Sequence, residues 1–367
     1  MKTVLVLFGG RSAEHEISLV SARFVIDSLD PARYQAVLCG IDKDGRWHHL
    51  DASQLPQSRD PRHVSVNATA PCAWLEPMPP RVGEKHVLHV ERSAPIPFDV
   101  VFPVMHGPYG EDGCLQGLLE LAAVPYVGSG VAASAVGMDK LLQKRVFAQA
   151  ELPLVPWTSF DRAAYRANAQ GALEGAAALG FPCFVKPANM GSSLGVSKVK
   201  RREELRAAVE LALELDTTVL IEQGLEAPRE IEFAILGNDE PVVSEPGEII
   251  VEHADGFYSY EAKYLDPNGA RLAVPAELRS AERASLQVLA LQAYRVLGCA
   301  GLARVDLFVS GGEAYVNEVN TLPGFTAVSM VPRLWKAGGL HGMALVSRLL
   351  ELAFERSAVR RALRTTR

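Results

Sequence analysis

Short, largely apolar runs recur in the first part of the chain, at residues 3–8, 34–41 and 98–104. Runs of this length without alternating polar positions are typical of strands that are buried on both faces of a parallel sheet. A glycine pair follows the first run, and Ser12 after it can cap a helix that carries Glu14 in its first turn. The order strand, helix, strand predicts an open α/β unit at the start of the chain.

Helical and strand periods alternate in the second part of the chain. Apolar residues recur at helical spacing over residues 138–152, 201–215 and 280–297, and Ser280 is the candidate N-cap of the last helix. The stretch 51–97 is rich in proline, arginine and histidine and lacks a clear period, so we expect only short strands there. The other strands expected in the second part of the chain are 181–188, 218–225, 231–236 and the hairpin 303–324.

Composition narrows the class of protein. The 367 residues are 48% hydrophobic and 22% charged, as in a globular protein of two or three domains. The net charge of −6 argues against a broad nucleic-acid-binding surface. The five cysteines form no CxxC motif, so we expect reduced thiols in a cytoplasmic protein. The first apolar run is too short for a signal peptide, and no stretch reaches the ~20 apolar residues of a membrane helix.

Charged residues stand at two-residue spacing in the otherwise apolar hairpin 303–324. Arg304 and Asp306 lie in its first strand, and Glu318 and Asn320 lie in its second. Because side chains alternate across a strand, each pair faces one side of the sheet, and the Ser-Gly-Gly turn makes the strands antiparallel neighbours. If the two polar faces coincide, two carboxylates and an amide oxygen converge, a set that suits Mg²⁺ or Mn²⁺. The alternative is an exposed sheet face with ordinary solvated charges.

A lysine and a glycine–serine loop form a second candidate site. Lys186 ends an expected strand, and Ser192 and Ser193 lie in the loop that follows. Glycines let the backbone approach a ligand closely, and the serines offer hydroxyl and N–H donors to phosphate oxygens. The sequence has neither a Walker loop nor a Rossmann glycine pattern. The alternative is a plain hairpin turn with a surface lysine.

Four other residues carry weaker signals. Glu222 and Glu230 lie near strand ends, where an acid can accept ribose hydroxyls, although a solvated glutamate is the more common case. Glu14 lies beside strand-end glycines, where α/β sheets bind substrates, and a helix-dipole role is the alternative. His106 lies in the glycine-rich loop MHGPYGEDG, where a functional and a structural histidine are both open.

The polar segment 257–265 is dense in aromatic residues and contains Lys263 and Tyr264. Long polar loops of this kind often close over a ligand and exclude water. The alternative is a packed surface loop whose tyrosine rings are buried.

The ordered set of motifs resembles the D-alanine–D-alanine ligases of the ATP-grasp superfamily, over nearly the whole chain. Each motif alone is a weak signal, but their order and spacing together are specific. The motifs are GGRSAEHEISLVSA (9–22), HGPYGEDGCLQG (106–117), MDK (138–140), KPANMGSSLGVSKV (186–199), LIEQGL (220–225), YEAKY (260–264), RVDLF (304–308) and NEVNTLPGFT (317–326).

The resemblance implies an ATP-grasp fold of the α/β class. An N-terminal open α/β domain, residues 1–138, would precede a central domain, 139–224, and a C-terminal domain, 225–367, and the last two would sandwich ATP. The implied reaction joins two D-alanine molecules through a D-alanyl phosphate for peptidoglycan synthesis. The implied protein is a cytoplasmic homodimer with no nucleic-acid or membrane partner.

The resemblance also implies ligands for ATP and for two Mg²⁺ ions, with Mn²⁺ as a possible substitute. The metals would be held by Asp306, Glu318 and Asn320. Glu222 would act through backbone contacts beside the adenine, and Glu230 would bind the ribose. The nucleotide-binding set as a whole is Lys140, Lys186, Ser193, Glu222, Gln223, Glu230 and Asn317. Gln223 departs from the family, in which many members have lysine there, although glutamine can still donate to a ring nitrogen.

Roles towards the amino-acid substrates follow from the same resemblance. Glu14, helped by His106, would hold the first D-alanine, and Lys263 and Ser329 would hold the carboxylate of the second. Arg304 and the N–H of Gly324 would stabilise the tetrahedral oxyanion. The closing loop would be locked by hydrogen bonds among Ser192, Tyr264 and Glu14, and a tyrosine at position 264 favours an amine acceptor over a hydroxy acid.

Three alternatives are open at this point. Another ATP-grasp ligase, making a different dipeptide or D-alanyl-D-lactate, is the nearest of them. A nucleotide-binding protein without enzymatic activity is the second, although the complete set of lysine, arginine and carboxylates argues against it. A hydride-transfer enzyme is the third, and FGGRSAE lacks the third glycine that such a site needs.

Overall fold

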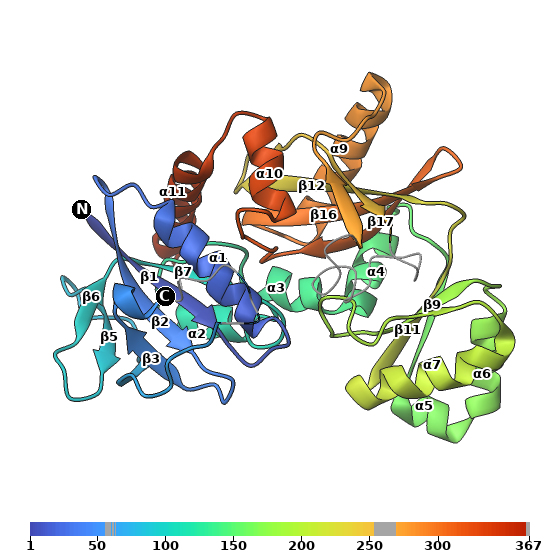
Figure 1. Ribbon diagram of the computed structural model, residues 1–367, viewed down its shortest axis with the longest axis horizontal. Coiled ribbons are helices and arrows are strands. Elements are labelled where there is room, and N and C mark those ends of the chain that lie inside the picture. Colours follow the sequence, from blue (N-terminus) through green and yellow to red (C-terminus); the bar gives the residue numbers. More distant parts are fainter. Residues whose placement is uncertain (56–59, 61, 63, 253–268, 365–367) are drawn as a thin grey trace.

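The computed structural model describes residues 1–55, 60, 62, 64–252 and 269–364, and three β-sheets follow one another along the chain (Figure 1). In Figure 1 the first sheet lies on the left, the second at the lower right, and the third between and above them. Helices pack against each sheet, so the α/β class expected from the sequence is confirmed.

The first sheet has a parallel centre and an antiparallel extension. Its order is β6-β5-β4-β3-β2-β1-β7, and β1 pairs in parallel with β2 and β7. From Thr3 to Gly9, β1 is fully buried, as its continuous apolar run predicts. The stretch 51–97 supplies short strands that widen the sheet. The strands are β1 (Lys2–Gly9), β2 (Tyr34–Ile41), β3 (Trp47–Leu50), β4 (Cys72–Trp74), β5 (His86–Val90), β6 (Ile96–Phe98) and β7 (Val100–Met105), with a short 3-10 helix η1 (Ala52–Gln54) after β3.

Helix α1 (His15–Asp27) connects β1 to β2, but Ser12 does not cap it. Glu14 occupies the N-cap position without a side-chain cap hydrogen bond. The hydroxyl of Ser12 instead accepts the N–H of Glu14 at 3.2 Å. The predicted cap is wrong because Ser12 lies two residues before the N-cap, and a capping side chain must reach the second or third N–H of the helix.

Three helices lead from the first sheet to the second. They are α2 (Cys114–Leu121), α3 (Val131–Met138) and α4 (Lys140–Gln149). Asp139 caps α4, because its Oδ1 accepts the N–H groups of Leu141 and Leu142, each at 2.9 Å. The helix is therefore shorter than the predicted 138–152, and Lys140 is its first residue.

The second sheet is antiparallel, in the order β10-β9-β11-β8. One face carries a core that includes Val185 and Ile221 and is packed by three helices. The opposite face carries Lys186 and Glu222 and turns towards α4, where Leu141 packs on Leu220. The elements are β8 (Trp157–Asp161), α5 (Arg162–Ala167), α6 (Ala169–Ala177), β9 (Cys183–Pro187), β10 (Ser197–Val199), α7 (Arg202–Leu215) and β11 (Thr218–Gln223).

The third sheet has the order β15-β14-β12-β16-β17, with β13 beside β12. Helix α9 (Ser280–Val296) packs on one face over a core that includes Phe233, Val305 and Val316. Ser280 is the first helical residue and Arg279 holds the N-cap position without a side-chain cap, so the predicted serine cap is wrong by one residue. The strands are β12 (Arg229–Gly237), β13 (Val242–Val243), β14 (Gly247–Val251), β15 (Ala270–Ala273), β16 (Gly301–Ser310) and β17 (Glu313–Asn320).

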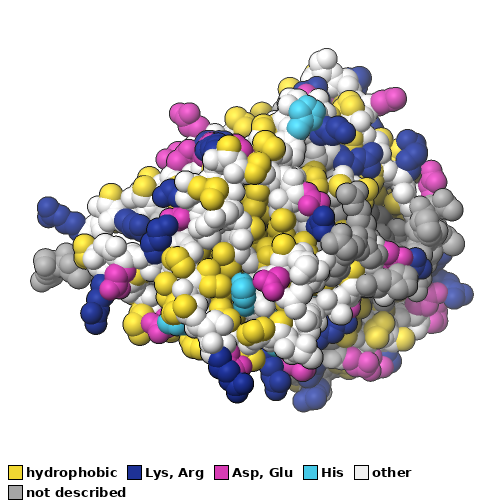
Figure 2. All heavy atoms as spheres, turned by 60° about the vertical axis from the view of Figure 1, so that its left-hand side comes forward, with side chains coloured by type: hydrophobic (Ala, Val, Ile, Leu, Met, Phe, Trp, Pro, Cys, Tyr) yellow, Lys and Arg dark blue, Asp and Glu magenta, His cyan; other side chains and the backbone are white. Residues whose placement is uncertain are grey.

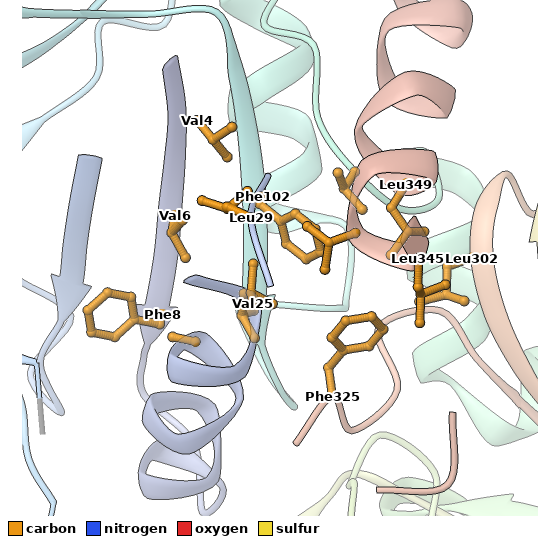
Figure 3. Close-up of a cluster of buried hydrophobic side chains, with 14 of the residues drawn as sticks. Val4, Val6, Phe8, Val25, Leu29, Phe102, Leu302, Phe325, Leu345 and Leu349 are labelled. Atoms are coloured by element: carbon orange, nitrogen blue, oxygen red, sulfur yellow. The ribbon is translucent and has the colours of Figure 1, made fainter. Parts of the chain in front are cut away.

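The C-terminal helices α10 (Met330–Ala337) and α11 (Gly342–Ala362) join the third sheet to the first. Leu345 and Leu349 of α11 share one buried cluster with Val4 and Phe102 of the first sheet, and Phe325 lies between the two groups (Figure 3). The segment after β17 is thus held on the first sheet, which places its loop beside the end of β7.

The surface mixes charges of both signs. Lys and Arg side chains and Asp and Glu side chains are interspersed over the face shown in Figure 2. All five cysteines are free, as expected from their spacing. Within the described ranges, no helix combines the length and the apolar composition needed to cross a bilayer.

Candidate functional site

A cleft lies between the second and third sheets, on their facing sides. Its empty volume, counted with the open mouth, is about 1370 Å³. The second sheet contributes Lys186, Glu222 and Gln223 to the wall, with Ser192 and Ser193 from the loop between β9 and β10. The third sheet, the start of α4 and the loop before α2 complete the polar lining. These residues are Glu230, Glu232, Arg304, Asp306, Asn317, Glu318 and Asn320 of the sheet, Lys140 of α4 and Glu111 of the loop.

The hairpin β16–β17 places its polar residues side by side. Asp306 pairs with Glu318 and Arg304 pairs with Asn320, so the expected convergence of the two polar faces is confirmed. A bulge follows, because Leu307 pairs with Val316 and leaves Asn317 as an extra residue. The bulge turns two consecutive side chains, Asn317 and Glu318, towards the cleft.

Arg304 is held by carboxylates on two strands. Its guanidinium donates to both oxygens of Asp306, at 2.7 and 2.6 Å, and lies 3.3 Å from Oε2 of Glu232. Burial alone would lower the pKa of Arg304, but Asp306 and then Glu232 raise it well above its usual value. The group is therefore a fixed cation at the cleft wall.

The hairpin donors fit a hard cation. Nδ2 of Asn320 donates to Asp306 at 3.0 Å, and Oε2 of Glu318 lies 3.9 Å from the ammonium of Lys140. Among the described residues no cluster of three or more His, Cys, Asp or Glu side chains has a metal-binding arrangement. Two carboxylates and an amide leave positions for water and phosphate oxygens, as Mg²⁺ requires. The ligand types therefore suit Mg²⁺, while both oxygens of Asp306 accept hydrogen bonds from Arg304 in this arrangement.

Lysines from two elements reach the cleft. Lys140 donates to the carbonyl of Met190 at 2.6 Å, which ties α4 to the glycine–serine loop. Lys186 forms an ion pair with Oε2 of Glu222, and burial alone would lower its pKa, but Glu222 raises it. Both lysines line the cleft, on the wall where the sequence motifs place phosphate binding.

The carboxylate of Glu222 is not available to a ligand. It is 3% exposed and forms ion pairs with Lys144 and Lys186. Gln223 follows it at the exposed edge of β11, and Glu230 stands half-buried near the start of β12. Because its carboxylate is occupied, Glu222 offers a nucleotide its backbone groups, and the expected role beside the adenine stays a prediction.

The glycine–serine loop bridges the cleft and the first sheet. Ser192 and Ser193 have φ angles of 52° and 58°, a left-handed conformation that is uncommon outside glycine and often marks functional sites. A Cβ atom at Gly191 would lie 3.2 Å from Oε2 of Glu14. Glu14 and Ser192 also line one smaller cavity together with Gly107. The structure therefore brings these two predicted residues together.

The loop after β17 holds two more predicted residues. A Cβ atom at Gly324 would lie 3.2 Å from the hydroxyl of Ser329, which also accepts the N–H of Thr326 at 3.0 Å. His106 is 5% exposed, and its ring lies between the carbonyl of Leu322 at 3.1 Å and the hydroxyl of Ser21 at 3.4 Å. His106 thus fixes this loop to the first sheet. Lys263 and Tyr264 lie outside the described residues.

Sequence reasoning missed four polar residues of the site. Glu111 accepts the N–H of Gly107 at 2.6 Å, and burial, followed by the charge of Glu14, raises its pKa to about 8. Its motif HGPYGEDG was noted for the histidine alone. Lys144 and Gln143 lie on the same helix as Lys140 and could have been found from their spacing of four and three residues. The fourth, Glu232, has no signal in the sequence, because its role depends on the ion pair with Arg304 that only the structure shows.

Comparisons with known proteins agree with this arrangement. The family models "D-ala D-ala ligase N-terminus" and "D-ala D-ala ligase C-terminus" match residues 3–129 and 146–351. The chain is 47% identical over 364 residues to the D-alanine–D-alanine ligase A of Escherichia coli (strain K12), covering 98% of each chain. It is 46% identical over 357 residues to the D-alanine–D-alanine ligase of Shouchella clausii, covering 97% of this chain and 95% of the relative.

Solved structures show the same fold over nearly the whole length. The D-alanine–D-alanine ligase from Coxiella burnetii superposes with a TM-score of 0.83 at 35% identity, covering 98% of this chain and 96% of that one. The VanG D-Ala:D-Ser ligase from Enterococcus faecalis has a TM-score of 0.82 at 34% identity, with coverage of 96% and 99%. With both family models matched and near-complete relatives at this identity, the chain belongs to the D-alanine–D-alanine ligase family and has its ATP-grasp fold.

Proposed function

We propose that this protein joins two D-alanine molecules to D-alanyl-D-alanine, with hydrolysis of ATP to ADP and phosphate, for peptidoglycan synthesis in the cytoplasm. One observation supports this most strongly: a single cleft collects two lysines, a buried arginine and the Asp306, Glu318 and Asn320 set between two sheets. Transfer of a phosphoryl group between anions needs positive charge at its equatorial oxygens and exclusion of water.

Lys140 and Lys186 bind the phosphates of ATP, and Ser193, Gln223, Glu230 and Asn317 complete the nucleotide contacts with the backbone of Glu222. Asp306, Glu318 and Asn320 would hold two Mg²⁺ ions, or Mn²⁺ in their place. When bound, these ions neutralise phosphate charge as Lewis acids. All three residues that would hold them lie on the hairpin β16–β17.

Glu14 holds the ammonium group of the first D-alanine, with His106 fixing the neighbouring loop. The carboxylate of this substrate attacks the γ-phosphorus of ATP. The bond between the γ-phosphoryl group and ADP breaks, and D-alanyl phosphate and ADP are formed. Acyl phosphates react with water, so the loop that carries Ser192 closes over the site, locked through Glu14 and Tyr264.

Lys263 and Ser329 hold the carboxylate of the second D-alanine, whose neutral amine attacks the acyl carbon. Arg304 and the N–H of Gly324 stabilise the tetrahedral oxyanion, and inorganic phosphate leaves as the peptide bond forms. The attacking amine must lose its proton, and nearby cations such as Arg304 favour the neutral form.

A coupled phosphate-release assay tests this function. Purified protein with ATP and Mg²⁺ is given D-alanine, L-alanine, D-serine or D-lactate in parallel, and the products are identified by mass spectrometry. We expect release with D-alanine and a product of D-alanyl-D-alanine mass. No release with D-alanine, or a product formed only when D-lactate or D-serine is added, would contradict the proposal.

The domain limits 1–138, 139–224 and 225–367 and the homodimer are parts of the same proposal. The three sheets fall one within each proposed domain, which supports these limits. Light scattering after size-exclusion chromatography should give twice the chain mass of 39.7 kDa, and a mass of one chain would contradict the dimer.

A further inference from the structure

Helix α4 buries a lysine that none of the roles above uses. Lys144 is 1% exposed, and its ammonium forms an ion pair with Oε1 of Glu222 on β11. No other hydrogen-bond partner of this ammonium is found in the part of the chain that the structure describes. A buried ammonium is costly unless it is paired, so the placement of Lys144 depends on Glu222.

The second oxygen of the same carboxylate serves the cleft. Oε2 of Glu222 pairs with Lys186, which stands on the neighbouring strand β9 and lines the cleft wall. The side chain of Lys186 is 14% exposed, against 2% for Lys144. The three groups therefore form a line of ion pairs in which Glu222 lies between the buried Lys144 and Lys186, which can contact a ligand.

The net charge of this line of ion pairs sets the charge that a ligand in the cleft encounters at Lys186. Two ammonium groups share one carboxylate, so the line carries a net charge of plus one. Without Lys144, Glu222 would neutralise Lys186, and the wall would present no net charge at this point. Burial alone would raise the pKa of Glu222, but Lys144 and then Lys186 hold it at about 2, which keeps the carboxylate ionised at neutral pH.

The frame around the line is rigid and apolar. Leu141 of α4, Ala188 and Leu220 form a buried cluster with the partly buried Trp157 on this side of the second sheet. These apolar side chains shield the ion pair of Lys144 and Glu222 from water, and charges interact more strongly in such surroundings than at a surface. Removing the charge of Lys144 should therefore change the electrostatic potential at the cleft.

We propose that Lys144 is a positioning residue for nucleotide binding: by sharing Glu222, it leaves Lys186 with net positive charge for the phosphates of a nucleoside triphosphate. The inference rests on the proposed function, because it takes ATP as the ligand of the cleft. Lys144 acts through Glu222 and does not itself touch the ligand.

Calorimetric binding of ATP and of adenosine separates this role from a merely structural one. The variant Lys144→Met keeps the length of the side chain and removes its charge. We expect it to bind ATP about tenfold more weakly and adenosine with unchanged affinity, because adenosine carries no phosphate. The control Arg145→Met removes a positive charge from an exposed position of the same helix and should bind ATP within about twofold of the unchanged protein.

A second comparison holds even where the single variant does not fold. In Glu222→Gln there is no carboxylate to share, so adding Lys144→Met should change the affinity for ATP by less than about threefold. Where the single variant folds, the double variant should bind ATP more tightly than Lys144→Met. A larger change in the Glu222→Gln background, or equal losses for ATP and adenosine in Lys144→Met, would overturn the inference.

ATP binding by the unchanged protein distinguishes a failure of the proposed function from a failure of the role proposed for Lys144. If it does not bind ATP, the proposed function fails. If it binds ATP and Lys144→Met binds ATP equally well, the function stands and only the role of Lys144 is wrong.

Discussion

Replacing Gln143 by leucine tests how α4 fixes β17, the strand that carries two of the proposed metal ligands. Gln143 is 2% exposed, and its amide meets the backbone of Val319, which lies between Glu318 and Asn320. Oε1 accepts the N–H of Val319 at 2.8 Å, while Nε2 donates to the carbonyl of Val319 at 3.3 Å and to that of Gly137 at 2.5 Å. Since β17 is the edge strand of the third sheet, this side chain takes the place of a neighbouring strand.

The expected loss of stability follows from these bonds. Leucine is close to glutamine in size, so the cavity term is small, but one buried N–H and two carbonyls lose a partner. A buried donor without a partner costs about 1–3 kcal/mol, and each lost acceptor bond costs about 0.5–1.5 kcal/mol. The free energy of unfolding should therefore fall by about 2–6 kcal/mol.

Urea unfolding followed by circular dichroism measures this difference, and the Mg²⁺ concentration that gives half the maximal rate serves as a second readout. The Mg²⁺ concentration at half the maximal rate should rise, because the backbone between Glu318 and Asn320 is no longer held in place by Gln143. Gln149→Leu is the matched control, since it makes the same change at an exposed position of the same helix and should stay within about 0.5 kcal/mol. Equal stabilities of the two variants would refute the reasoning.

The remaining predictions concern the metal set, a titrating carboxyl group and a close backbone contact. Glu318→Ala should abolish turnover with unchanged circular dichroism, whereas Glu313→Ala at the exposed end of the same strand should keep the rate, and near-normal turnover of the first would refute the metal assignment. The pKa of Glu111 is raised to about 8, so its protonated form stabilises the fold below about pH 4.5 and this contribution is lost as the pH rises to about 8. Glu111→Gln should therefore gain stability relative to the unchanged protein from pH 5 to pH 9, and a difference that does not vary with pH would count against this. Gly301→Ala should lower the free energy of unfolding by about 1–3 kcal/mol more than Gly311→Ala. Both glycines have positive φ, but only a Cβ at Gly301 would lie 3.2 Å from a backbone atom, the nitrogen of Gly128. Equal losses in urea unfolding would contradict the close contact.

The periods of the sequence predicted most of the elements. The fully apolar run of β1 and the amphipathic spacing of α7 appear in the structure within one or two residues of their expected bounds. The ends of helices were less well predicted. Ser12 and Ser280 both have cap chemistry, but neither occupies an N-cap position, because the first turn of a helix is settled by how the chain leaves the preceding strand or loop.

The sequence by itself determined which side chains could act together within one element or hairpin. Alternation requires that Arg304 and Asp306 share one face of β16 and that Glu318 and Asn320 share one face of β17. Only the tertiary structure decided that a bulge places Glu318 opposite Asp306 and turns Asn317 to the same face, and that Lys144 and Lys186 share the buried carboxylate of Glu222. Local periods carry no information on either, because a bulge depends on the register of two strands, and an ion pair between distant elements depends on how helix and sheet pack.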